Sequence, residues 1–171
     1  MKLLVDTSVW LLALRRRDAA SLSEGEQELR TQLTQAIQDG RVAMIGQIRQ
    51  ELLSGIKEQV QFDRVKNALD AFLDEQVDTE DYEGAALLYN ACKSQRVEAG
   101  TVDMLICAVA TRRNWRVLSN DAGLNRCCEI AKSFQEQSEK PPVSDHRKQR
   151  PQADRKTRKR RQLESARRRP E

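Results

Sequence analysis

Three short apolar segments, separated by longer stretches with helical periodicity, constrain the fold of this chain more than any other feature of its sequence. They comprise residues 2–6, 41–45 and 115–118. Each segment is too short for a buried helix and has the aliphatic and β-branched composition of a fully buried strand. Strands joined through helices indicate crossover connections. The sequence therefore predicts an α/β fold in which a short parallel sheet lies between layers of helices.

The stretches between these segments carry apolar residues three and four positions apart, as on one face of an amphipathic helix. Serines followed by glutamates near residue 23 indicate a helix start, and Gly40 indicates where that helix ends. Helices are expected at about residues 7–14, 21–40, 46–56, 62–72, 82–89 and 101–110, and from residue 120 onwards.

Charge is divided unevenly along the 171 residues. The 30 Lys and Arg against 26 Asp and Glu give a net charge of only +4, but residues 140–171 alone hold 13 basic and 4 acidic residues. The same segment contains all four prolines and no aromatic residue. Such a composition buries too little apolar surface to fold alone. We expect an acidic domain over residues 1–135 and a basic, disordered tail over residues 136–171.

Several classes of protein are excluded by composition. No apolar run approaches the roughly 18–20 residues that cross a bilayer, so no membrane association is expected. The four cysteines show no C-x-x-C spacing and the only histidine is His146, which argues against a zinc site and favours reduced thiols in a cytoplasmic protein. No glycine-rich loop follows the first apolar segment, which argues against P-loop and dinucleotide-binding folds.

Four acidic residues occupy the positions where sites form in parallel sheets, beyond strand ends or in the first turns of the helices that follow. They are Asp6, Glu51, Asp103 and Asp121. An acid in a first helical turn can simply be stabilised by the helix dipole. Grouped carboxylates without histidine or cysteine, however, favour a hard cation, Mg²⁺ or Mn²⁺. Such an ion lowers the pKa of bound water and stabilises charge on a phosphoryl oxygen, which makes phosphodiester hydrolysis the expected reaction class.

Four blocks of sequence resemble the ordered motifs of PIN-domain nucleases, and in particular those of VapC-type toxins from bacterial toxin–antitoxin pairs. The blocks are LLVDTSVW at 3–10, ELLSG at 51–55, VDMLICA at 102–108 and VLSND at 117–121. The resemblance covers roughly residues 1–130 and keeps both the order and the approximate spacing of the motifs. It implies a three-layer α/β/α fold and a metal-dependent endoribonuclease that forms a homodimer and is neutralised by a VapB-like antitoxin.

The same resemblance implies roles for individual residues. Asp6, Glu51 and Asp103 would be metal ligands, and Asp121 would bind metal directly or through water. Ser8 would orient water or a carboxylate, although a cap of the first helix is an equally good interpretation.

Other polar residues receive weaker interpretations. Arg112, Arg113 and Arg116 are candidates for contacts with RNA phosphates, or else are surface cations, and the same alternatives apply to residues 15–17. Four further acids match no motif and are expected on solvated helix surfaces. These are Asp63, Asp70, Asp78 and Asp81.

Two departures from the family pattern leave questions open. The chain has Gly123 where the family often has another acid, which bears on whether one or two metal ions bind. It also lacks an obvious apolar strand after the last helix. Two alternative functions remain at this stage. One is a catalytically inactive PIN scaffold that binds RNA or serves as a regulatory module. The other is a metal-dependent phosphoesterase with another substrate.

The basic tail generates the first prediction. If residues 140–171 bind RNA through phosphate contacts, truncation after Glu139 weakens RNA binding and flattens the dependence of log K on log[salt], by about 0.7 in slope for each lost contact. Metal-dependent cleavage at saturating RNA persists. Binding of labelled RNA over a salt series measures both effects, and an unchanged slope would show that the tail takes no part.

Overall fold

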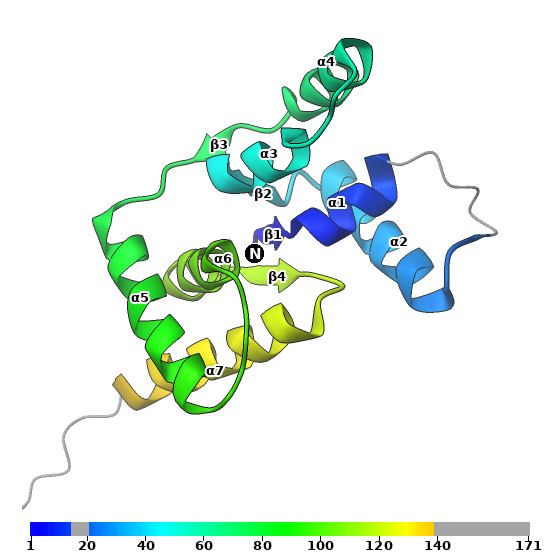
Figure 1. The fold of residues 1–171 in the computed structure, drawn as a ribbon. Helices are drawn as coiled ribbons and strands as arrows, with labels where there is room; N and C mark the ends of the chain where they lie inside the picture. Colours follow the sequence, from blue (N-terminus) through cyan, green and yellow to red (C-terminus); the bar gives the residue numbers. More distant parts are fainter. Residues whose placement is uncertain (15–20, 139–171) are drawn as a thin grey trace, which may run out of the picture. The chain divides into compact units, whose positions relative to one another are not determined.

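The strands form one parallel sheet with the order β3-β2-β1-β4 (Figure 1). The computed structural model describes residues 1–14 and 21–138, so the interpretations of residues 15–17 and of the basic tail concern residues outside the described part. The strands are β1 (Leu3–Val5), β2 (Val42–Ile45), β3 (Asp74–Glu75) and β4 (Arg116–Leu118). Three of them are the strands predicted from apolar segments. The sequence did not predict β3, because this two-residue edge strand carries charged side chains.

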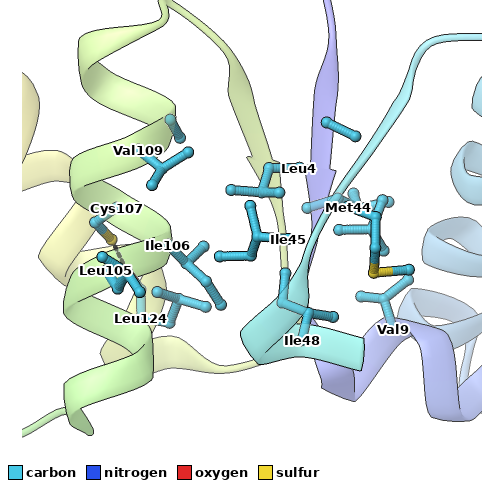
Figure 2. Close-up of a cluster of buried hydrophobic side chains, with 14 of the residues drawn as sticks. Leu4, Val9, Met44, Ile45, Ile48, Leu105, Ile106, Cys107, Val109 and Leu124 are labelled. Atoms are coloured by element: carbon cyan, nitrogen blue, oxygen red, sulfur yellow. Dashed lines mark hydrogen bonds between the residues drawn. The ribbon is translucent and has the colours of Figure 1, made fainter. Parts of the chain in front are cut away.

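Helices cover both faces of this sheet. They are α1 (Thr7–Leu14), α2 (Glu24–Gln38), α3 (Gly46–Leu53), α4 (Gln59–Leu69), α5 (Thr79–Ser94), α6 (Thr101–Arg112) and α7 (Ala122–Ser138). The helices α5, α6 and α7 contact one another, while α1 contacts α2 and α3. Figure 2 shows Leu4 and Ile45 directed towards Ile106 of α6, and Met44 directed towards Val9 of α1. The predicted three-layer α/β/α fold is therefore confirmed.

The local signals in the sequence account for where several helices begin and end. Ser23 accepts a hydrogen bond from the Glu26 amide, and the Glu26 carboxylate accepts one from the Ser23 amide, so α2 begins with a capping box at the predicted helix start. Gly40 follows α2 with φ of +62°, a conformation that glycine adopts without strain. The helix α7 runs to Ser138, and no strand follows it within the described residues.

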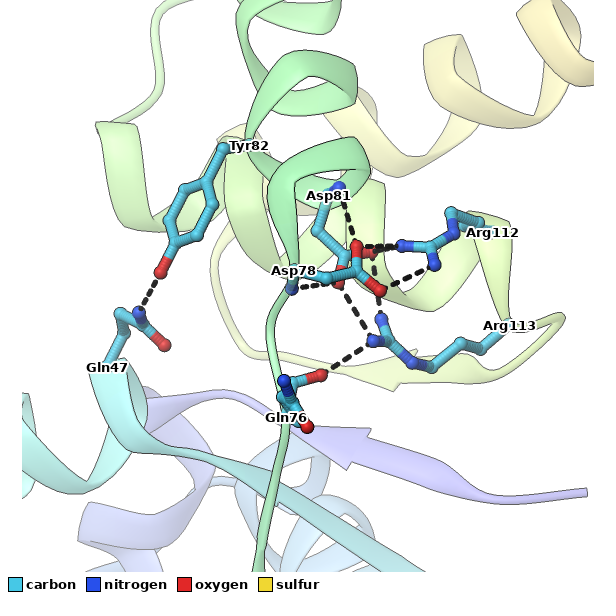
Figure 3. A network of polar contacts seen from close by, with 7 residues as sticks. All are labelled: Gln47, Gln76, Asp78, Asp81, Tyr82, Arg112 and Arg113. Carbon is cyan, nitrogen blue, oxygen red and sulfur yellow. Dashed lines mark hydrogen bonds and ion pairs between the residues drawn. The ribbon is translucent and has the colours of Figure 1, made fainter.

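A network of arginines and aspartates joins α5 to α6 (Figure 3). Arg112 contacts both Asp78 and Asp81, with Nη1 2.7 Å from Asp81 Oδ1 and Nη2 2.7 Å from Asp78 Oδ2. Arg113 donates to both Asp81 oxygens at 2.9 and 2.8 Å, and to the Gln76 carbonyl at 2.7 Å. The Arg112 guanidinium holds the pKa of the Asp78 carboxyl well below its usual range.

This network corrects one prediction from the sequence. Asp63 and Asp70 are exposed as expected, but the expectation that Asp81 is solvated is wrong, because its side chain is only 1% exposed. Asp81 also completes the capping box of α5 with Asp78. Its arginine partners come from the end of α6, more than 30 residues away in sequence. Only the packing of α5 against α6 brings them together.

None of the described helices is both long and apolar enough to cross a membrane.

The network predicts the effect of neutralising its buried acid. Asp81→Asn leaves two guanidinium groups without their shared charge and lowers the free energy of unfolding by roughly 2–3 kcal/mol. Asp70→Asn changes an exposed acid of the same size, and leaves the free energy of unfolding within about 0.5 kcal/mol of the wild-type value. Urea denaturation followed by circular dichroism at neutral pH measures both. Equal stability of the two variants would contradict the assigned role of Asp81.

Candidate active site

The candidate site lies where the chain reverses its direction of travel across the sheet. From β1 the chain crosses to β2 and then β3 on one side, and it later returns to place β4 on the other side of β1. Crevices at such switch points, beyond the carboxyl ends of parallel strands, are where α/β sheets bind ligands. Asp6 follows β1 at this point, and its amide donates to the Leu118 carbonyl at 2.9 Å. This bond places Asp6 beside the segment that follows β4.

Asp6 is held by two hydroxyl groups. Its Oδ2 accepts hydrogen bonds from Ser8 Oγ at 2.5 Å and from Ser119 Oγ at 2.9 Å. The Ser8 hydroxyl also accepts from the amide of Asn120 at 3.1 Å. The Asp6 side chain is only 6% exposed, so these donors compensate for much of its lost hydration.

Ser8 therefore donates to a carboxylate in the structure, the contact that the first of the two interpretations requires. Ser119, which is 7% exposed, was missed by sequence reasoning. It stands two residues before Asp121 in the last of the four motif blocks, and its hydroxyl also accepts from the Asp121 amide at 2.9 Å. Its position inside that block was the signal that could have identified it.

Glu51 comes to the same edge of the sheet from α3, which begins directly after β2. Thr7 Oγ1, in the first turn of α1, donates to Glu51 Oε2 at 2.7 Å. This bond joins α1 to α3. Because Thr7 directly follows Asp6 in the sequence, it also brings Glu51 close to Asp6. The Glu51 side chain is otherwise exposed.

Asp103 and Asp121 each stand at the beginning of a helix. Asp103 Oδ2 accepts from the Gly100 amide at 2.7 Å, and Asp121 Oδ1 accepts from the Leu124 amide at 2.7 Å. Both carboxylates thus stabilise a helix N-terminus. One oxygen of each acid therefore acts in helix capping. The second oxygen of each accepts no hydrogen bond from the described residues and is available to a ligand.

The four predicted acids come close enough to influence one another. Burial raises the pKa of the Asp103 carboxyl, and the negative charges of Asp6, Asp121 and Glu51 raise it further, against the lowering effect of the Gly100 amide. One oxygen of each carboxylate accepts no hydrogen bond from the described residues. These are Asp6 Oδ1, Glu51 Oε1, Asp103 Oδ1 and Asp121 Oδ2.

The site is also without internal counter-charges. No Lys or Arg of the described residues forms an ion pair with any of these four acids. Four carboxylate oxygens without a cationic partner form a donor set that suits a hard, oxygen-binding cation. As the side chains stand, however, no three acidic, histidine or cysteine side chains of residues 1–14 and 21–138 form a ready metal site.

Gly123 stands where the family often carries an additional acid, and a side chain there would be tightly placed. A Cβ atom there would lie 3.0 Å from Asp121 Oδ1 and 3.0 Å from the Glu98 carbonyl oxygen. The segment before α6 packs closely over the start of α7, so a side chain at position 123 would displace one of them.

The three arginines considered for RNA contacts lie away from these acids. Arg112 is nine residues beyond Asp103 on α6, about 14 Å along the helix axis. Arg116 begins β4, whereas the acids follow the ends of the strands. Arg112 and Arg113 are engaged with Asp78 and Asp81. The structure therefore does not bring these arginines into the candidate site.

Comparison with known proteins agrees with this arrangement. No curated protein matches the chain significantly. The solved structure titled "Crystal Structure of FitAcB from Neisseria gonorrhoeae" is similar in fold, with a TM-score of 0.57 at 16% sequence identity, and the match covers 74% of this chain and 93% of that chain. The model of the PIN domain family matches residues 3–130, the span that holds all four acids. The chain therefore belongs to the PIN domain family.

Proposed function

We propose that this protein is an endoribonuclease that depends on Mg²⁺ or Mn²⁺ and hydrolyses RNA phosphodiester bonds. The observation that carries the proposal is the convergence of Asp6, Glu51, Asp103 and Asp121, from four separate segments, at the switch point of the sheet. PIN domains are in general nucleases, which supports the same reaction class.

Asp6, Glu51 and Asp103 are the proposed metal ligands, and Asp121 binds directly or through water. When bound, the cation supplies a more acidic water and stabilises negative charge on a phosphoryl oxygen. Like charges without a counter-ion repel one another. This repulsion accounts for four carboxylates that lie near one another but do not converge as a set of metal ligands. Their free oxygens can turn inward once that repulsion is neutralised.

The chain's own residues have three tasks in this proposal. Ser8 and Ser119 hold the Asp6 carboxylate in one orientation through its Oδ2. Thr7 restrains Glu51, and the helix-capping bonds restrain Asp103 and Asp121. In the proposed reaction, water attacks phosphorus in line with the bond to the 3′ oxygen. That bond breaks and leaves a 5′-phosphate and a 3′-hydroxyl.

The biological role that we propose is that of a VapC-like toxin, a cytoplasmic homodimer neutralised by a VapB-like antitoxin. It rests on the resemblance of the four motif blocks, which all lie within the PIN domain match. An inactive PIN scaffold is a weaker alternative, because all four acids are present and free of internal counter-charges.

Neutralising a proposed ligand tests the reaction. Asp6→Asn and Asp103→Asn each lower the rate of RNA cleavage with Mg²⁺ or Mn²⁺ by at least about 100-fold, because each removes a ligand charge. Gel analysis of a defined single-stranded RNA measures the loss. Asp70→Asn, the matched change on an exposed helix end, cleaves as the wild type does.

Two results would count against the proposal. Wild-type cleavage by both purified ligand variants would refute the assigned site. Hydrolysis of a small phosphodiester but not of RNA, tested in parallel, would favour the phosphoesterase alternative.

A second prediction concerns stability without metal. Because the pKa of Asp103 is raised in the folded protein, its charged form costs stability at neutral pH. This cost declines as the pH falls below the folded-state pKa and is gone below the unfolded-state pKa. Asp103→Asn removes the cost and can still accept the Gly100 hydrogen bond, so it raises the Tm of the metal-free protein by about 3 °C.

Added Mg²⁺ or Mn²⁺ reverses this order. The wild-type Tm rises with metal concentration, because the metal binds the folded state, and the Tm of the Asp103→Asn variant rises less. Differential scanning fluorimetry in EDTA and over a metal series measures both effects. A metal-free variant that melts below the wild type would show that Asp103 is not under electrostatic strain.

A further inference from the structure

An uncharged groove of about 530 Å³ lies between α5, α6 and the start of α3. The residues of its lining that matter here are Gln47, Tyr82, Tyr89, Asn90, Thr101 and Val102. We call it the tyrosine groove. None of its lining residues carries a charge, in contrast to the four acids beside it.

The tyrosine groove is lined by the two helices that carry Glu51 and Asp103, α3 and α6, together with α5. Val102 and Met104, both in its lining, stand on either side of Asp103 in the sequence. Gln47 lies four residues before Glu51 on α3, so the two share one face of that helix with Cβ atoms about 6 Å apart. A ligand at the acids and a ligand in the groove would therefore lie on the same two helices.

Gln47 carries a hydrogen-bond acceptor without a partner, and this acceptor lies beneath the surface of the groove. Its Nε2 donates to the Tyr82 hydroxyl at 3.0 Å, and Figure 3 shows Oε1 at the other end of the amide, away from that hydroxyl. Oε1 is buried and has no hydrogen-bond partner among the described residues. Buried polar atoms are normally satisfied, so a turn of this amide towards the groove would offer the acceptor to a ligand that donates an N–H or O–H.

Two aromatic rings add stacking surface. Tyr82 and Tyr89 are 50% and 42% exposed and lie seven residues apart, on the same face of α5. Lys93 Nζ lies 5.8 Å from the centroid of the Tyr89 ring, so a cation stands beside that ring. Uncharged planar groups stack on such rings, and a phosphate attached to one would find a counter-charge in Lys93.

We infer that the tyrosine groove binds an unpaired RNA base adjacent to the phosphodiester that is cut, an inference that rests on the proposed ribonuclease function. Tyr89 and Tyr82 provide the stacking surface. Gln47 Oε1 accepts an N–H from the edge of the base when the Gln47 amide turns towards the groove. A phosphate does not suit the groove, because the lining offers no cation and two of the acids stand on its helices. Neutral, planar, N–H-donating chemistry does suit it, and nucleobases have this chemistry.

The test separates bases from backbone. Full-length wild-type protein binds a labelled RNA tetranucleotide, and separately the abasic ribose-phosphate of the same length, in EDTA and about 0.3 M NaCl. These conditions prevent cleavage and weaken non-specific contacts between phosphates and the basic tail. We expect the wild type to lose about tenfold in affinity without the bases. Tyr89→Ala binds the two ligands almost equally.

Two further variants sharpen the result. Leu87→Ala removes an apolar side chain that is 72% exposed on α5 but lies outside the groove lining, and it keeps the wild-type difference between RNA and abasic ligand. Gln47→Met keeps the length of the side chain and removes the acceptor. It reduces the discrimination between adenine, cytosine and uracil tetranucleotides, because the base edge is then no longer read.

Three outcomes would overturn the inference. One is a wild type that binds RNA and abasic ligand alike. Another is a Tyr89→Ala variant with the wild-type preference for bases. The third is a Tyr89→Ala variant that changes from dimer to monomer in light scattering while its preference for bases is unchanged, which would assign the groove to a second copy of the chain. None of these three outcomes depends on RNA cleavage. If any of them is found while the Asp6→Asn variant loses cleavage, the groove inference fails but the ribonuclease proposal stands.

Discussion

The pairing of β1 with β4 is the constraint on which the rest of the site depends. The two strands are brought side by side in parallel, and their last shared bond joins the Asp6 amide to the Leu118 carbonyl. That bond places Asp6 against Ser119, whose hydroxyl links Asp6 to the backbone of Asp121. Without this register, the first and last motif blocks, more than 110 residues apart in sequence, would not meet.

Two groups of acids in this chain differ in whether basic side chains neutralise them. Asp78 and Asp81 are neutralised by Arg112 and Arg113, and this internal pairing joins α5 to α6. The acids at the carboxyl edge of the sheet have no such partner in the described part of the chain, and the pKa of Asp103 is raised in consequence of burial and of its neighbours' charges. Leaving carboxylates unneutralised costs stability. The proposed binding of an external cation at this site would account for that cost.

The α5–α6 pair also connects the fold to the tyrosine groove. The arginine network holds the first turn of α5 against the last turn of α6. The groove then opens along the same two helices towards the N-terminus of α6, where Asp103 lies. A rigid support at one end of the pair and a groove along it fit the proposed protein that positions substrate next to fixed carboxylates.

The sequence by itself determined the fold class, three of the four strands and the four acids, because each leaves a local signal. Buried strands leave apolar runs, helix ends leave capping residues, and the acids stand within short motif blocks. What only the tertiary structure decided are the contacts between residues distant in sequence. The burial of Asp81, the role of Ser119 in holding Asp6, the pairing of the charged strand β3 and the unpartnered oxygen of Gln47 belong to this group. Each depends on which side chains face one another after packing, and a pattern of neighbours along the chain does not contain that information.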